Sequence, residues 1–154
     1  MQIPATLSLK GRALRCLASR EHSRLEMERK LASHETEPGE LARVLDDLQA
    51  KGFISEQRVV ESVVNRRAAR HGASRIRQEL LGKGIDPQTV QQTVAELQTS
   101  ERERALAVWQ RKFGEAAADA QGKAKQMRFL AARGFSMDVI GRVVRGGGAD
   151  PDDE

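Results

Sequence analysis

Apolar side chains recur at helical spacing along most of the chain, with turn signals between the periodic segments. Residues at i, i+3, i+4 and i+7 share one face of an α-helix, so this spacing indicates a helix that packs on a core. The stretch 59–85 shows it twice, before and after a break at Gly72, with Ile76 and Leu80 as the apolar pair of the second part. No segment has the strict alternation of a half-buried strand. The pattern predicts an all-α chain.

Polar residues at the starts of the periodic segments predict where the helices begin. Ser23 with Glu26, and Ser100 with Glu103, have the spacing of a capping box, in which two side chains satisfy free backbone N–H groups. The Asp-Pro pair at 86–87 combines a good N-cap with a proline in the first turn. The nine predicted helices begin near Leu9, Ser23, Pro38, Ser55, Ser74, Asp86 and Ser100, after Gly122 and near Ser136.

The predicted helices come in groups of three. The segments 83–86 (Lys-Gly-Ile-Asp) and 133–136 (Arg-Gly-Phe-Ser) lie 50 residues apart, and each places a basic residue, a glycine that can adopt positive φ, an apolar residue and a new N-cap between two helices. Such small units bury little surface alone, so neighbours must pack on one another. We predict three tandem three-helix repeats in an elongated, curved array. The expected boundaries are an N-terminal arm (1–8), repeat 1 (9–52), repeat 2 (53–99), repeat 3 (100–145) and a disordered Gly/acidic tail (146–154).

The charge is unevenly distributed along the chain. Lys and Arg number 26 against 22 Asp and Glu, which gives a net charge of +4. Four of the acidic residues crowd the C-terminus, so the rest of the chain carries +8. A basic body suits nucleic acid, an acidic protein surface or an anionic filament as its partner. The four are Asp150, Asp152, Asp153 and Glu154.

Two features bear on location and redox chemistry. The single cysteine, Cys16, lies among apolar residues of the first predicted helix, so we expect a buried structural thiol and not a nucleophile. No apolar run approaches the roughly 18 residues of a membrane span, and residues 1–8 do not resemble a signal peptide. We therefore expect a cytoplasmic protein without a membrane partner.

The residues that usually carry chemistry are scattered. His22, His34 and His71 occupy separate turns and helix ends, with no cysteine or carboxylate at metal-ligand spacing. The glycine triplet 146–148 follows the last predicted helix instead of opening one, so it is not a phosphate loop. Trp109 lies at core spacing, which favours packing over base stacking. We expect a binding protein that is not an enzyme and needs no cofactor or metal.

Basic side chains crowd the predicted break around Gly72. Arg66 and Arg70 continue the edge of the apolar face of the preceding helix, so that face turns cationic near its end. A solvated basic face is the plain alternative, because arginine complements a helix C-terminus and Arg75 with Glu79 forms an ordinary i,i+4 pair. The candidate binding residues are Arg66, Arg67, Arg70, Arg75, Arg77 and Lys83.

Three segments resemble, in this order, motifs of the RecX family, the regulatory proteins of the RecA recombinase. The first two are 20–24 (Arg-Glu-His-Ser-Arg) and 51–54 (Lys-Gly-Phe-Ile). The third is 72–85, in which Arg-Ile at 75–76, Glu-Leu at 79–80 and Lys-Gly-Ile at 83–85 resemble the family. The resemblance covers about residues 10–145. Phe53 and Val59 stand where the family usually has tyrosine and phenylalanine.

The resemblance implies a modulator that lies in the groove of the RecA filament on single-stranded DNA and inhibits strand exchange, ATP hydrolysis and co-protease activity. It also implies a role in homologous recombination, DNA repair and the SOS response. The expected partners are RecA, single-stranded DNA and, further, duplex DNA, and the chain is expected to act as a monomer. The six basic residues would then face the filament's DNA or acidic surface. The alternatives are a stand-alone helical DNA-binding protein or regulator that acts without RecA, and a structural scaffold.

Overall fold

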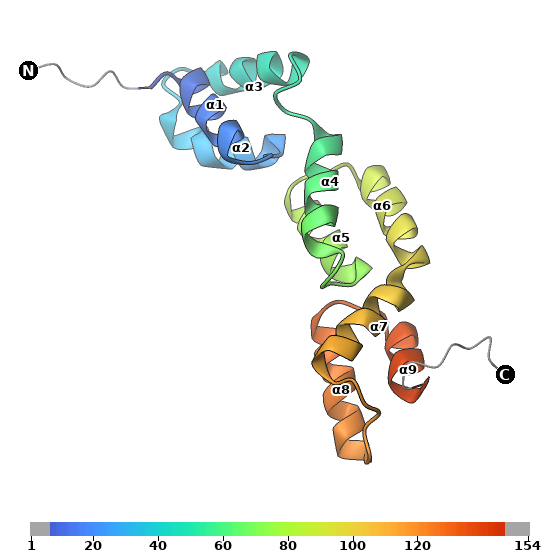
Figure 1. Ribbon diagram of the computed structural model, residues 1–154. Coiled ribbons are helices and arrows are strands. Elements are labelled where there is room, and N and C mark those ends of the chain that lie inside the picture. The colour runs from blue at the N-terminus through green and yellow to red at the C-terminus, as the bar shows by residue number, and fades with distance from the viewer. Residues whose placement is uncertain (1–6, 147–154) are drawn as a thin grey trace, which may run out of the picture. The chain divides into compact units, whose positions relative to one another are not determined.

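The computed structural model describes residues 7–146, and over that range it contains nine α-helices, one short 3-10 helix and no strand (Figure 1). The all-α prediction and the grouping into three-helix repeats are confirmed. The trios are α1–α3, α4–α6 and α7–α9. The helices are α1 (Leu9–Ser19), α2 (Arg24–Leu31), η1 (Ala32–His34), α3 (Glu40–Ala50), α4 (Glu56–Arg67), α5 (Ala73–Gly82), α6 (Pro87–Thr99), α7 (Glu101–Lys112), α8 (Ala120–Ala132) and α9 (Met137–Gly146).

The chain divides into two compact units. Unit 1 contains the residues up to Ser62 together with Gly82–Ile85, and unit 2 contains Val63–Leu81 and the residues from Asp86 onward. The second repeat therefore contributes to both units. The exact repeat boundaries and the elongated, curved array stay predictions.

Unit 1 is built on a leucine-rich core between α1, α2 and α3. Met27, Leu45 and Leu48 are fully enclosed, and burial of each such side chain contributes about 1.5–3 kcal/mol. Cys16 packs against this core half-buried, so its expected packing role holds although burial is incomplete. The buried members of this core are Leu9, Ala13, Met27, Leu31, Leu41, Leu45, Leu48 and Ile54.

One apolar cluster of unit 2 lies between α7, α8 and α9. Trp109 is only 1% exposed, and its Nε1–H donates to Gln126 Oε1 at 3.0 Å. Gln126 in turn donates to the Glu115 carbonyl, so the buried indole has its polar atom satisfied. This confirms Trp109 as a core residue. The buried members are Ala105, Val108, Trp109, Leu130, Phe135, Ile140, Val143 and Val144.

Most helix starts follow the predicted capping signals. Ser23 and Glu26 form the capping box, with Glu26 N–H to Ser23 Oγ and Ser23 N–H to Glu26 Oε1 both at 3.2 Å. Asp86 caps α6 with proline in its first turn, and Ser136 Oγ accepts the N–H of Val139 at the start of α9. Local sequence therefore determines these boundaries, because cap and N–H group lie within one turn.

One predicted capping box and two predicted starts are wrong. The eighth helix begins at Ala120 and not after Gly122, because Asp119 caps it through the N–H of Gly122. The seventh helix does follow Ser100. Ser100 makes no cap bond: its hydroxyl donates to the Leu97 carbonyl and accepts from Arg104 Nε, so a long-range arginine network has taken it. The third helix begins at Glu40 and not at Pro38, because Gly39 is the N-cap residue with φ of 84°. The expected disordered tail lies, except for Gly146, outside the described residues.

None of the helices in the described range combines the length and apolar character needed to span a bilayer.

Candidate nucleic-acid interface

The loop 68–72, between α4 and α5, is held by arginines from other parts of unit 2. We call this loop and the side chains that donate to it the arginine joint. The last carbonyls of a helix lack intrahelical partners, and a guanidinium fork can serve several of them at once. Arg104 donates to the carbonyls of Ala68 (3.0 Å) and His71 (2.6 Å), Arg111 to Ala69 (3.0 Å), and Arg133 to Arg70 (3.5 Å).

Backbone also meets backbone in the arginine joint. Gly72 N–H donates to the Arg133 carbonyl at 2.8 Å, and a Cβ on Gly72 would overlap the Gly134 carbonyl. A Cβ on Gly134 would lie 2.6 Å from Arg75 Cβ, and Arg75 Nη1 donates to the Ala132 carbonyl at 2.9 Å. The backbone at the start of α5 and the backbone of the turn between α8 and α9 are thus in direct contact. This contact requires glycine in both segments, because a Cβ in either one would overlap the other.

The joint buries one carboxylate and one imidazole among these cations. Glu101, only 4% exposed, accepts the N–H of Ala73 at 3.3 Å and so satisfies the first turn of α5. Burial lowers the pKa of His71, and the nearby charges of Arg75, Arg67 and Arg133 lower it further. Burial likewise lowers the pKa of Arg104, against the attraction of Glu101. The joint is therefore a region of positive potential around a neutral histidine.

The structure brings four of the six predicted binding residues to this region. Arg66 and Arg67 both donate to Glu79, at 3.3 and 3.2 Å, so this carboxylate offsets part of their charge. Arg67 and Arg75 line a hollow of about 360 Å³ together with Glu79. Arg70 lines a second hollow, next to Arg133.

The other two predicted residues lie elsewhere. Arg77 is two residues from Arg75, which is about 200° around the helix, and it lines neither hollow. Lys83 belongs to unit 1, where its ammonium donates to Glu26 at 3.0 Å and only 16% of its side chain is exposed. Its charge is already compensated inside the fold.

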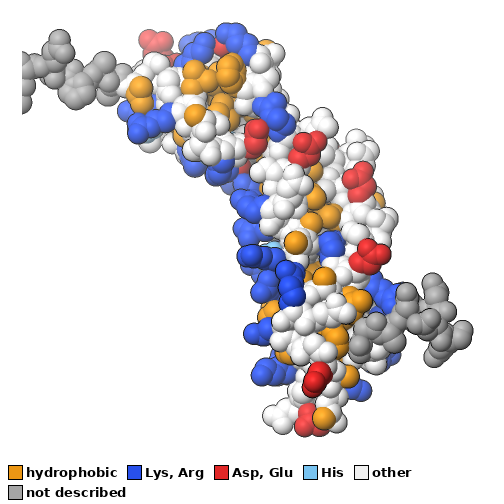
Figure 2. Space-filling model, in the orientation of Figure 1, with side chains coloured by type: hydrophobic (Ala, Val, Ile, Leu, Met, Phe, Trp, Pro, Cys, Tyr) orange, Lys and Arg blue, Asp and Glu red, His pale blue; other side chains and the backbone are white. Residues whose placement is uncertain are grey.

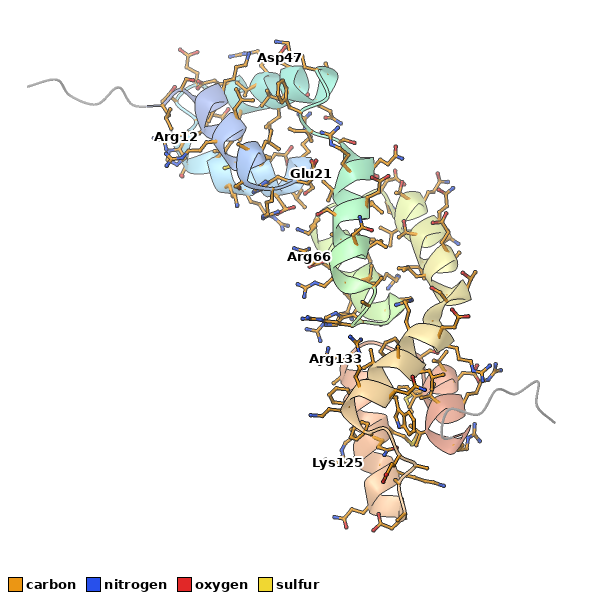
Figure 3. The ribbon with its side chains drawn as sticks, viewed as in Figure 1. Arg12, Glu21, Asp47, Arg66, Lys125 and Arg133 are labelled. Carbon is orange, nitrogen blue, oxygen red and sulfur yellow. The ribbon has the colours of Figure 1, made fainter. Side chains whose placement is uncertain are left out.

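Positive side chains gather along one edge of unit 2 (Figure 2). Arg66, Arg133 and Lys125 lie along this edge and mark its extent from α4 to α8 (Figure 3). A row of exposed and half-exposed cations is suited to the phosphates of a nucleic acid or to an acidic protein surface. We call it the cationic strip; its members are Arg66, Arg67, Arg70, Arg75, Arg111, Lys112, Lys125 and Arg133.

Half of the strip was missed by the sequence analysis. Arg111 and Lys112 form the basic last turn of α7, and Arg133 is the basic residue of the repeated turn motif, so local signals for cations existed. What brings them to Arg70 is a set of contacts across 42 and 63 residues. Periodicity carries no information about such pairs.

Comparisons of the sequence with family models and with curated proteins all give matches to the RecX family. Three models of the RecX family match in order: its first three-helix domain over residues 10–48, its second over 55–94 and its third over 100–144. The chain is 57% identical over 139 residues to a "Regulatory protein RecX" from Leptothrix cholodnii, covering 90% of this chain and 88% of that protein. It is 53% identical over 139 residues to one from Herminiimonas arsenicoxydans, covering 90% and 92%.

The fold has a counterpart among solved structures. The crystal structure of RecX from Lactobacillus salivarius superposes with a TM-score of 0.74 at 20% identity, covering 89% of this chain and 92% of that one. At this identity the likeness concerns the fold alone.

Proposed function

The chain belongs to the RecX family, and on that premise we propose that it binds the RecA filament on single-stranded DNA and inhibits its recombinase, ATPase and co-protease activities. The observation that carries this proposal is the ordered match of all three RecX domains. A regulator of this kind acts as a monomer in the cytoplasm and modulates recombination and DNA repair.

The cationic strip is the surface proposed for these contacts. Arg66 and Arg70 are both exposed. Arg70 has no ion-pair partner among the described residues, so it can reach a phosphate or a carboxylate at little cost, whereas Arg66 would share its guanidinium with Glu79. Arg67 and Arg75 contribute charge while they also hold the fold. Arg77 and Lys83 remain candidates, but the ammonium of Lys83 would first have to leave Glu26.

The proposal is tested by RecA-catalysed ATP hydrolysis on single-stranded DNA, with this protein added at sub-stoichiometric amounts and with DNA in excess. We expect inhibition well below one molecule per RecA protomer, since a groove-bound or end-bound regulator acts on many protomers. If inhibition begins only when the DNA is saturated, the chain is a stand-alone basic DNA binder and the proposal fails.

The strip is tested by the double variant Arg66→Ala/Arg70→Ala. Loss of two phosphate or carboxylate contacts should raise the half-inhibiting concentration roughly tenfold and flatten its salt dependence. Exposed arginines of this kind contribute under about 1 kcal/mol to stability, so the fold should persist. The matched control is Arg142→Ala/Arg145→Ala, two exposed arginines of α9, for which inhibition should stay within about twofold. Equal inhibition by all three proteins at every salt concentration would exclude the strip.

A further inference from the structure

A hollow of about 260 Å³ opens beside the arginine joint, where α7 and α8 meet the loop 68–72. We call it the aromatic hollow. Four of its six lining side chains are cations and one is an aromatic ring, and no carboxylate lines it. This combination sets it apart from the hollow beside Arg67, which contains Glu79. The lining residues are Arg70, Val108, Arg111, Lys112, Phe129 and Arg133.

The ring of Phe129 is fixed at the wall of the hollow. Phe113 packs against it edge to face, with ring centroids 5.4 Å apart at 87°. Lys112 Nζ lies 5.4 Å and Arg133 Cζ 5.1 Å from the ring centroid. Phe129 is only half-buried, although its neighbours Trp109 and Leu130 are enclosed in the core. Both cations lie over the ring in cation–π contacts, and the part of the ring that stays accessible offers an apolar surface next to positive charge.

The cations of the hollow are positioned but not neutralised. Arg111 and Arg133 each use one N–H on a backbone carbonyl, which fixes the guanidinium while most of its five donors stay available. Within the part of the chain that the structure describes, none of the hollow's four cations has an ion-pair partner: Arg70, Arg111, Lys112 and Arg133. An anion that enters would therefore meet donors already in place.

We infer that the aromatic hollow binds one nucleotide unit of a single-stranded nucleic acid directly, without RecA. The phosphate would be held by Arg70, Arg111 and Lys112, and the base would stack on Phe129 and on the guanidinium of Arg133. The inference depends on the proposed function in one respect only, which is that the nucleic acid is single-stranded DNA.

Two arguments favour this occupant. Only a single strand offers the face of a base to an aromatic ring, because a duplex keeps both faces stacked. The hollow is also smaller than the roughly 300 Å³ at which pockets for whole small molecules begin, so it suits one unit of a longer chain. An acidic peptide or free phosphate would use the cations alone and would not use the accessible part of the Phe129 ring.

The test compares two strands on the full-length protein alone, by fluorescence anisotropy at low salt. One is an oligothymidylate, and the other is an abasic oligomer of the same length and charge. Stacking on one aromatic ring should make the wild type bind the oligothymidylate roughly tenfold more tightly. Phe129→Leu should remove most of that preference and leave the affinity for the abasic strand unchanged.

A second variant separates phosphate binding from stacking. Lys112→Ala should weaken binding of both strands and reduce the salt slope by about 0.7, as expected for one phosphate contact. Arg142→Ala, an equal charge change on α9, is the matched control. Circular dichroism establishes that each variant is folded.

Three results would overturn the inference: no preference of the wild type for bases, an equal loss for both strands in Phe129→Leu, or displacement of the oligothymidylate by polyglutamate at equal charge concentration. Inhibition of RecA is measured separately. If Phe129→Leu shows no base effect while the wild type still inhibits RecA, only the hollow is excluded. If the base effect is present and RecA is not inhibited, only the proposed function fails.

Discussion

The two turns that share one sequence motif meet neighbours of opposite charge. In unit 1, Lys83 follows α5 and donates to Glu26 of α2. In unit 2, Arg133 occupies the same place in the motif, and the position 49 residues after Glu26 is Arg75. We call the contact of α2 with residues 82–84 the glutamate joint. Glu26 neutralises Lys83 inside unit 1, whereas the equivalent position in unit 2 holds Arg75, which has the same charge as Arg133. The positive charge of Arg133 is therefore left to solvent or to a partner.

The two joints are otherwise built alike. Each has an arginine that donates to the carbonyl before the basic residue: Arg29 to Gly82 at 3.3 Å and Arg75 to Ala132 at 2.9 Å. Each turn glycine is left-handed, with φ of 75° at Gly84 and 86° at Gly134. The turn therefore serves as a general packing element, and its neighbours decide whether it also forms a binding surface.

Replacement of the turn glycines should give the largest effects and should separate the joints. A Cβ at Gly134 would lie 2.8 Å from the backbone nitrogen of Arg75, which cannot move aside. At Gly84 it would meet only side-chain atoms, Leu25 Cδ2 at 2.8 Å and Leu25 Cβ at 2.9 Å, so a smaller shift of α2 relieves the overlap. In both variants the alanine must also adopt a positive φ, which costs further free energy. We expect Gly134→Ala to lower the free energy of unfolding by about 3 kcal/mol and Gly84→Ala by about 1–2 kcal/mol. Urea unfolding measures both; equal losses would contradict the difference in rigidity.

Removal of the central polar groups should give the next largest effects. Glu26 accepts from Arg20 (2.7 Å), Lys83 (3.0 Å) and Ser23 N–H (3.2 Å), so Glu26→Gln leaves a half-buried lysine unpaired. We expect a loss of about 2 kcal/mol. Arg75→Gln removes one bond to a carbonyl and should cost about 1 kcal/mol. A larger loss for Arg75→Gln, measured by the same urea titration, would mean that the arginine joint depends on its charge.

The pH dependence of stability should distinguish the two joints at two separate pH ranges. Burial alone raises the pKa of Glu26, but its bonds from Arg20, Lys83 and Ser23 lower it to about 2 from its ordinary 4.5. Below pH 4.5 the unfolded chain takes up this proton first, so stability present above pH 4.5 is lost as the pH falls toward 2. Glu26→Gln should lack this loss in urea titrations across that range.

The histidines give the second range and extend the comparison. Burial lowers the pKa of both His22 and His71, which lie 49 residues apart in equivalent turns. Their neutral forms are favoured in the fold, so stability is full above pH 6.5 and falls as the unfolded chain is protonated below it. Arg75→Gln should raise the pKa of His71 and leave that of His22 unchanged, as followed by NMR. A shift of both would contradict the separation of the joints.

Prediction from sequence succeeded where the interacting groups lie close along the chain. The capping box of Ser23 and Glu26 and the left-handed Gly84 and Gly134 all concern residues within one helical turn or one loop. Trp109 was assigned correctly because periodicity reports which face of a helix is buried. The helix start predicted at Ser100 is correct, but its capping box failed because Arg104, engaged with the loop 68–72, bonds the Ser100 hydroxyl.

For the candidate site, the sequence by itself determined that cations are dense around Gly72 and that the chain repeats a three-helix plan. Only the tertiary structure decided which cations are available: Lys83 is compensated by Glu26, whereas Arg133 is brought beside Arg70 and Phe129. The physical reason is that helical periodicity and capping act over a few residues, but the free energy of a charge depends on whatever packs against it. In this chain that partner lies tens of residues away, on another repeat.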